Sequence, residues 1–125
     1  SVDYETRLVQ TLGGAGEAGV TAELDGVRTA VTKSNREKLR ALLTIYERQR
    51  TKRGIEPGEG VIVIRVGERT VILVEEGDRA LDETFYSVQT GRWKRSFRTE
   101  GYKSYYWIAR TVGPEGYYGE NAILE

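Results

Sequence analysis

The sequence contains no cysteine, no histidine and no methionine, and only two of its 125 residues are proline. Without cysteine the chain can form no disulfide bond and perform no thiol chemistry. Without histidine it lacks the commonest metal ligand and the commonest general base near neutral pH. Catalysis would have to rest on carboxylates, lysine or tyrosine, and no pair of these stands out. We therefore predict that the protein is not an enzyme and uses no cofactor or metal.

Long hydrophobic runs are also missing. No apolar stretch approaches the length of a membrane span, and no signal-peptide pattern opens the chain. We therefore expect a single cytoplasmic domain that does not enter a membrane. Charged residues make up 30% of the chain, which has only two asparagines and three glutamines, a composition typical of thermophilic proteins.

Acidic and basic residues are equal in number, 19 of each, but they are segregated along the chain. Residues 33–56 carry eight basic and three acidic side chains, and residues 84–112 carry six and one. Acidic residues dominate the segments between and around these two blocks. The electrostatic field is therefore expected to be bipolar although the net charge is zero.

The apolar pattern predicts an α+β fold, in which an antiparallel β-sheet of hairpins and a meander packs on one long amphipathic helix. Residues 3–12 favour a short N-terminal helix, and the next segment reads as a hairpin that turns at Asp25-Gly26. The long helix is expected over residues 34–53. Ser34 and Glu37 have the spacing of a capping box at its start.

Antiparallel strands are expected over residues 60–112. Residues 61–64 and 71–74 are apolar at every position, so this hairpin should lie at the centre of the sheet with both faces covered. Three further strands are predicted over residues 85–90, 93–99 and 102–112. A glycine-rich acidic tail, 113–125, follows.

Two other motifs are better explained without a ligand. Gly14, Gly16 and Gly19 match the dinucleotide-binding pattern G-x-G-x-x-G, but that pattern needs a preceding strand and a following helix, and a hairpin follows here. We interpret it as a flexible loop. The acidic cluster around residues 75–83 lacks a recognisable ligand spacing, so we interpret it as a solvated rim that balances nearby arginines.

The stretch "WKRSFRTEGYKSYYWIAR", residues 93–110, interleaves aromatic and basic side chains. Eight of the twelve aromatic residues lie between residues 85 and 107. On strands, alternate residues share a face, so Lys103, Tyr105 and Trp107 should lie together. Pairing with the neighbouring strand would place Trp93 beside Trp107. Exposed rings among cations are typical of proteins that stack the bases of a single strand and contact its phosphates.

The basic end of the expected helix, "RQRTKR", has more cations than the helix dipole requires, so a role in phosphate contact is plausible. The candidate nucleic-acid-binding residues are accordingly Trp93, Lys94, Arg95, Phe97, Arg98, Tyr102, Lys103, Tyr105, Trp107 and Arg110, together with Arg48, Arg50, Lys52 and Arg53.

The basic helix, the thermophile-like composition and "GRWKRSFRTEGYKSYYWIAR" together resemble the single-stranded-DNA-binding proteins of hyperthermophilic archaea known as the ThermoDBP group. The resemblance covers about half of the chain. It implies a cleft between helix and sheet that grips bases with aromatic rings, and a tendency to form homo-oligomers. The leucine-zipper tail of the founding type is absent from this sequence.

The leading hypothesis is a non-enzymatic, largely sequence-independent binder of single-stranded DNA. An RNA-binding protein is the first alternative, because no residue pattern reveals a contact to a 2′-hydroxyl. The second is a protein-interaction module whose aromatic and basic residues form a hot-spot surface, since Trp, Tyr and Arg dominate such sites. A metal-dependent nuclease ranks last.

Overall fold

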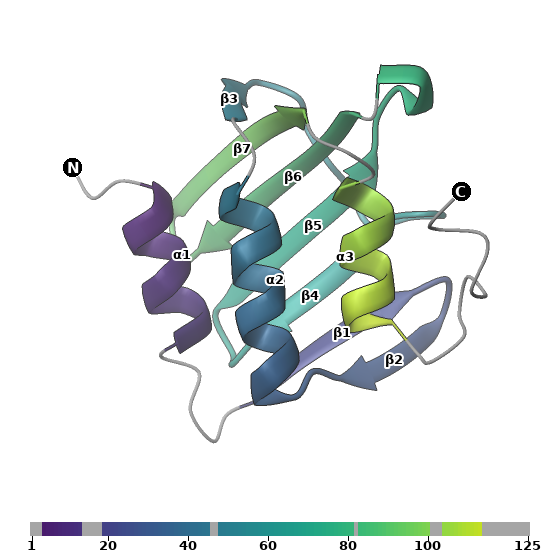
Figure 1. Cartoon of the computed structure of the whole chain (residues 1–125). Coiled ribbons are helices and arrows are strands. Elements are labelled where there is room, and N and C mark those ends of the chain that lie inside the picture. Colours follow the sequence, from purple (N-terminus) through teal and green to yellow (C-terminus); the bar gives the residue numbers. More distant parts are fainter. Residues whose placement is uncertain (1–3, 14–18, 46–47, 82, 101–103, 114–125) are drawn as a thin grey trace.

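The structure is a computed structural model of the chain, and it describes residues 4–13, 19–45, 48–81, 83–100 and 104–113. Within these residues the fold is α+β, with three helices lying across one face of a single antiparallel sheet (Figure 1). The predicted fold class is confirmed. The helices are α1 (Tyr4–Gly13), α2 (Lys33–Ile45) and α3 (Ser104–Val112).

The sheet has the strand order β2-β1-β4-β5-β6-β7-β3, and every neighbouring pair is antiparallel. A short 3₁₀ helix, η2 (Arg79–Leu81), connects β5 to β6. The strands are β1 (Val20–Leu24), β2 (Val27–Ala30), β3 (Arg48–Thr51), β4 (Ile62–Val66), β5 (Thr70–Glu76), β6 (Glu83–Thr90) and β7 (Trp93–Glu100).

Both predicted hairpins are present. Asp25 and Gly26 join β1 to β2, and both have positive φ angles of 48° and 85°, which is the conformation that a two-residue type I′ turn requires. The second hairpin, β4–β5, lies at the centre of the sheet as expected. Gly67, in its turn, has φ 60°.

The main core lies between the sheet and the helices. Each helix presents residues at helical spacing to the sheet: α1 buries Tyr4, Leu8 and Leu12, and α2 buries Leu39 and Leu43. The residues that α3 buries include Tyr105, Ile108, Ala109 and Val112. The facing side chains of the strands are mainly Val, Ile and Leu, so this side of the sheet is a continuous apolar layer.

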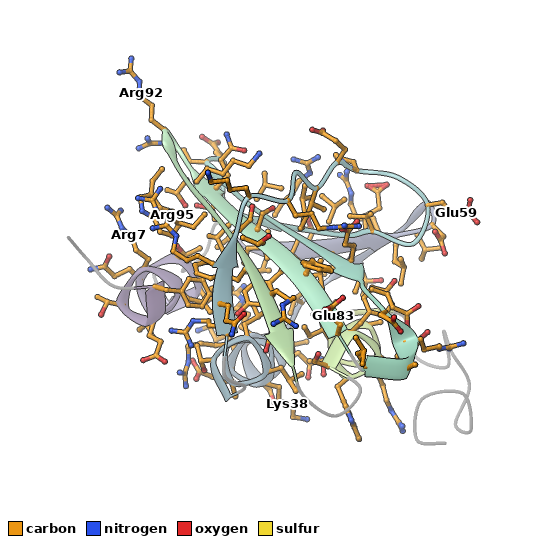
Figure 2. The ribbon with its side chains drawn as sticks, turned by 90° about the horizontal axis from the view of Figure 1, so that it is seen from above. Arg7, Lys38, Glu59, Glu83, Arg92 and Arg95 are labelled. Carbon is orange, nitrogen blue, oxygen red and sulfur yellow. The ribbon has the colours of Figure 1, made fainter. Side chains whose placement is uncertain are left out.

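The opposite face of the sheet is covered by the segment that runs from β3 to β4. Ile55, in this segment, is 1% exposed and packs with Val61, Val63 and Leu73 in a second, smaller apolar cluster. Figure 2 shows the helices below the sheet and the segment that carries Glu59 above it. The prediction that the central hairpin is covered on both faces is therefore confirmed.

The prediction of one long helix over residues 34–53 is wrong. α2 ends at Ile45, and Arg48–Thr51 form β3, which pairs with residues 96–99 of β7 at the edge of the sheet. Arginine and glutamine are good helix formers, but no apolar residue lies between positions 48 and 53. A helix continued there would have no apolar face to bury, whereas an edge strand can pair its backbone with β7 and leave these polar side chains in solvent.

The predicted capping box of Ser34 and Glu37 is also wrong. The helix begins at Lys33, and Thr32 is the cap, because its Oγ1 accepts a hydrogen bond from the backbone N–H of Asn35 at 3.2 Å. Glu37 instead pairs with Arg40 one turn further along, at 3.0 Å.

The predicted strand over residues 102–112 is wrong as well, because Ser104–Val112 form helix α3. The buried hydroxyls of Thr84 in β6 and Ser104 are hydrogen bonded at 2.6 Å, which ties the start of this helix to the sheet. None of the helices in the described part of the chain has the length and hydrophobicity needed to span a bilayer.

Substitution of Ile55 tests whether the segment between β3 and β4 stabilises the sheet. We expect Ile55→Ala to lower the free energy of unfolding by about 2–5 kcal/mol, because it removes a fully buried side chain and leaves a cavity. The matched control is Val27→Ala on edge strand β2, where the side chain is 45% exposed and the change should cost about 0.5 kcal/mol or less. Equal decreases in urea denaturation would show that residues 52–61 do not stabilise the sheet.

Candidate nucleic-acid interface

Two of the candidate binding residues belong to the core. Phe97 is 4% exposed, and its ring packs against those of Tyr4 and Tyr86 at centroid distances of 4.1 and 5.6 Å. Tyr105 is also 4% exposed, and its hydroxyl donates a hydrogen bond to the carbonyl oxygen of Gly60. Neither ring is presented to solvent, so neither is available to stack on a base.

The expected pair of adjacent indoles is wrong. Trp93 begins β7 and lies opposite Thr90 of β6, whereas Trp107 lies on α3. The pairing assumed that residues 102–112 form a strand beside β7, and that position in the sheet is taken by β3. Trp107 instead lines a groove between α2 and α3.

Three of the candidate arginines are held in ion pairs. Their partners come from distant parts of the chain: Arg48 pairs with Glu5, Arg53 with Glu75 and Arg98 with Glu83. Arg48 and Arg53 also lie over aromatic rings, those of Tyr4 at 4.4 Å and Phe85 at 4.5 Å. These contacts hold the edge of the sheet together, so the three arginines are less available to a ligand.

Four other candidate cations have no such contact within the described residues. Side chains that are exposed and form no ion pair within the described residues are those of Arg50, Lys52, Lys94 and Arg110. Tyr102 and Lys103 lie outside the described residues.

Two arginines from different elements lie against the ring of Trp93. The Cζ atom of Arg7, in α1, is 5.2 Å from the ring centroid, and that of Arg95, in β7, is 5.5 Å from it. Both distances are within the range of a cation–π contact. We call Arg7, Trp93 and Arg95 the arginine–tryptophan cluster. It joins the N-terminal helix to the strand that the sequence singled out.

The cluster is not neutralised within the part of the chain that the structure describes. Neither Arg7 nor Arg95 pairs with a carboxylate there, and the Nε atom of Arg7 is buried without a hydrogen-bond acceptor. Arg95 donates only to the backbone oxygen of Lys94, at 2.8 Å. Two like charges held near one ring repel each other, so an anion bound at this point would be stabilised by both.

The cluster lies at a free edge of the sheet. β3 pairs only with Ser96–Thr99, so among the described residues the first part of β7, Trp93–Arg95, has no strand on its outer side. Figure 2 shows Arg7 and Arg95 on the same side of the molecule, with Arg92 reaching out from the tip of the β6–β7 hairpin.

Arg69 adds a further cation at this tip. Its guanidinium lies over Gly91, where a Cβ atom would approach Nη2 to 2.6 Å. Gly91 has φ 57°, so glycine suits this turn for both its backbone angle and the close contact. Arg69, Arg92 and Lys94 are all exposed. Exposed cations therefore lie at the turn of the β6–β7 hairpin and at the start of β7.

A different surface holds the acidic residues. A cavity of about 380 Å³ beside η2 is lined by Glu59, Glu75 and Glu76 together with Arg79 and two tyrosines. Glu75 is paired with Arg53, and Glu76 with Arg79 at 3.7 Å. No group of three potential metal ligands occurs among the described residues. The arrangement agrees with the interpretation of an acidic rim balanced by arginines.

Sequence reasoning missed Arg7, Arg69 and Arg92 as parts of this surface. Arg7 lies 86 positions before Trp93, and only the packing of α1 on the sheet brings the two together. Arg92 and Arg69 occupy hairpin turns, where a basic residue is usually a solvated side chain. The alternation of cations and rings near residue 93 was the one signal in the sequence.

Comparisons with protein-family models, with curated proteins and with solved structures found no significant match. The resemblance to the ThermoDBP group therefore stays an expectation.

Tyr4 and Tyr86, which are buried in the core, should make the free energy of unfolding fall at alkaline pH. Burial raises the pKa of Tyr86 to about 12, and burial together with nearby Tyr86 raises the pKa of Tyr4 well above its usual value near 10. The folded state then holds these protons more tightly than the unfolded state. The resulting stability is present below pH 10 and is lost as the pH rises toward 12, by about 2–3 kcal/mol for Tyr86.

Chemical denaturation between pH 9 and pH 12 measures this decrease in the native protein and in Tyr86→Phe. The variant also lacks the hydrogen bond from the Tyr86 hydroxyl to the Leu43 oxygen at 2.9 Å, so it starts less stable, by about 1 kcal/mol. Between pH 9 and pH 12 the free energy of unfolding of the variant should fall by less than that of the native protein. Parallel declines in the two proteins would mean that Tyr86 ionises as readily in the folded state as in the unfolded state.

Proposed function

We propose that the protein binds single-stranded DNA, without catalysis and largely without regard to sequence, through the arginine–tryptophan cluster and the cations around it. The observation that carries the proposal is the pair of guanidinium groups on one indole ring, neither matched by a carboxylate within the described residues. A protein usually neutralises such groups, as this one does for Arg28, Arg40 and Arg48.

Phosphate is the anion that suits this geometry. Each guanidinium offers a planar fork of N–H donors that matches phosphate oxygens, and charge-assisted bonds of this kind are among the strong ones. Arg92 adds an exposed cation at the tip of the β6–β7 hairpin, on the same side of the molecule as Arg7 and Arg95 (Figure 2). A chain with regularly spaced phosphates would engage several of these cations at once.

The single strand is favoured over the duplex by the rings. Trp93 is partly exposed, although it packs against the core, and the guanidinium planes that lie on it can also stack on bases. Duplex bases hide their flat faces and would leave these groups without partners. Contacts to phosphates and to the faces of bases read no sequence, which is the reason for expecting little base specificity.

RNA is the second candidate, because neither the cations nor the ring distinguishes deoxyribose from ribose. A protein-interaction surface is less favoured, since an acidic partner would need to match the charges of both Arg7 and Arg95 beside one ring.

Binding of a labelled strand tests the proposal directly. We expect fluorescence anisotropy to show tighter binding to single-stranded DNA than to duplex DNA of the same length at the same salt concentration. A parallel titration with single-stranded RNA of the same length shows whether the protein prefers DNA or RNA. Equal affinity for duplex and single strand would contradict the role of the rings, and no binding of any strand at low salt would contradict the proposal itself.

The role of the cluster is tested by a double variant, Arg7→Gln with Arg95→Gln. We expect it to flatten the plot of log K against log salt concentration by roughly 0.7 for each phosphate that the protein no longer neutralises. The matched control is Arg28→Gln with Arg40→Gln, which removes the same charge from two arginines already paired with glutamates. If both double variants change the slope equally, binding depends on net charge and not on this cluster.

A further inference from the structure

A second candidate site lies on the outer side of the helices, between α2 and α3. A groove with a volume of about 520 Å³ is lined by residues of both helices. Asn35, Lys38 and Leu42 share one face of α2, at spacings of three and seven residues. Trp107, Arg110 and Thr111 share one face of α3, at spacings of three and four residues.

The residues that line the groove supply both apolar surface and positive charge. Ala41, Leu42 and Trp107 supply apolar surface, and Trp107 is the only large ring among the lining residues that the structure describes. Lys38 and Arg110 supply positive charge, and neither forms an ion pair with any described residue. In Figure 2 the side chain of Lys38 lies on the helical side of the molecule, away from Arg92 and the hairpin tip.

Polar groups suited to recognition are also present. The side chain of Asn35 offers both a donor and an acceptor. The hydroxyl of Thr111 donates to the backbone oxygen of Trp107 at 2.8 Å, which leaves its lone pairs free to accept. A mostly apolar pocket of several hundred Å³ with a few convergent polar groups is the usual form of a small-molecule site.

We propose that this groove binds one nucleotide unit, with the base against Trp107 and the phosphate between Lys38 and Arg110. The class of ligand rests on the proposed function, but the geometry is independent of the arginine–tryptophan cluster. A flat ring needs one aromatic platform, and a phosphate needs cations beside it. The groove has both, and the size of the cavity suits a small ligand.

An acidic helix from another protein fits the groove less well. Such a helix would need a row of apolar contacts spaced along several turns, whereas the described lining residues include a single ring and one leucine. The nucleotide unit could belong to a strand or be free in solution, and the two sources share the same chemistry.

Because each candidate site contains one tryptophan, variants with a single tryptophan report on the groove and on the arginine–tryptophan cluster separately by fluorescence. In Trp93→Phe, Trp107 is the one tryptophan left, and its fluorescence reports the groove. We expect thymidine monophosphate or a short oligothymidylate to quench this emission in a saturable way, while inorganic phosphate does not. If only the oligothymidylate quenches it, the unit is bound as part of a strand. If neither quenches Trp107, the proposal is overturned.

Charge variants in the Trp93→Phe protein identify the groove residues. We expect Lys38→Gln and Arg110→Gln each to weaken binding about tenfold, which is the effect of removing one charge-assisted hydrogen bond. Arg40→Gln, on the same helix but paired with Glu37, is the matched control and should change the affinity by less than about twofold. Equal effects of all three, or full displacement of the nucleotide by polyglutamate, would overturn the assignment to a nucleotide.

The complementary variant Trp107→Phe leaves Trp93 to report on the arginine–tryptophan cluster. A response of Trp93 to oligothymidylate without a response of Trp107 would retain the proposed function and reject the groove. A response of Trp107 alone would retain the groove and reject the cluster as the DNA-binding surface.

Discussion

The fold depends on the central hairpin, because β4 and β5 carry apolar side chains on both faces. One face is covered by the three helices and the other by the segment around Ile55. Together these layers occupy the middle of the sheet on both sides. Charged residues lie at the edges and hairpin tips, and the arginine–tryptophan cluster lies at the start of β7, where no described strand pairs with its outer side. The position of the candidate site is thus a consequence of how the apolar hairpin is buried.

Basic residues are clustered along the sequence, but several of them are paired with glutamates from other segments in the folded protein. Within the described residues six arginines are paired with glutamates, and several of these pairs join distant elements, as Arg48 joins β3 to α1. Of the four cations at the basic end of the expected helix, Arg48 and Arg53 are paired in this way, whereas Arg50 and Lys52 are not paired with any described residue. Outside these pairs, Arg7 and Arg95 lie against Trp93, and Lys38 and Arg110 line the groove with Trp107. Positive charge without a partner, more than positive charge itself, distinguishes the two candidate surfaces.

The sequence predicted the elements whose signals are local. The Asp25-Gly26 turn, the alternation in β6 and β7 and the apolar runs of β4 and β5 each depend on neighbouring residues alone. Helix α3 was mistaken for a strand because its aromatic and β-branched residues favour strands, although Tyr105, Ile108, Ala109 and Val112 have the spacing of a buried helical face. Strand β3 and the contact of Arg7 with Trp93 could not be predicted, because both arise only when distant segments pack together.

The strand order has a consequence for the way the chain folds. β4, β5, β6 and β7 are joined in sequence by short connections, so their pairing closes small loops at little entropic cost. β1 must pair with β4 across residues 25–61, and β3 with β7 across residues 52–95, so these contacts form at a greater cost. We expect the four-stranded meander to form early and the edge strands later. The contact of Arg7 in α1 with Trp93 in β7 spans 86 positions, and the arginine–tryptophan cluster would then be assembled near the end of folding.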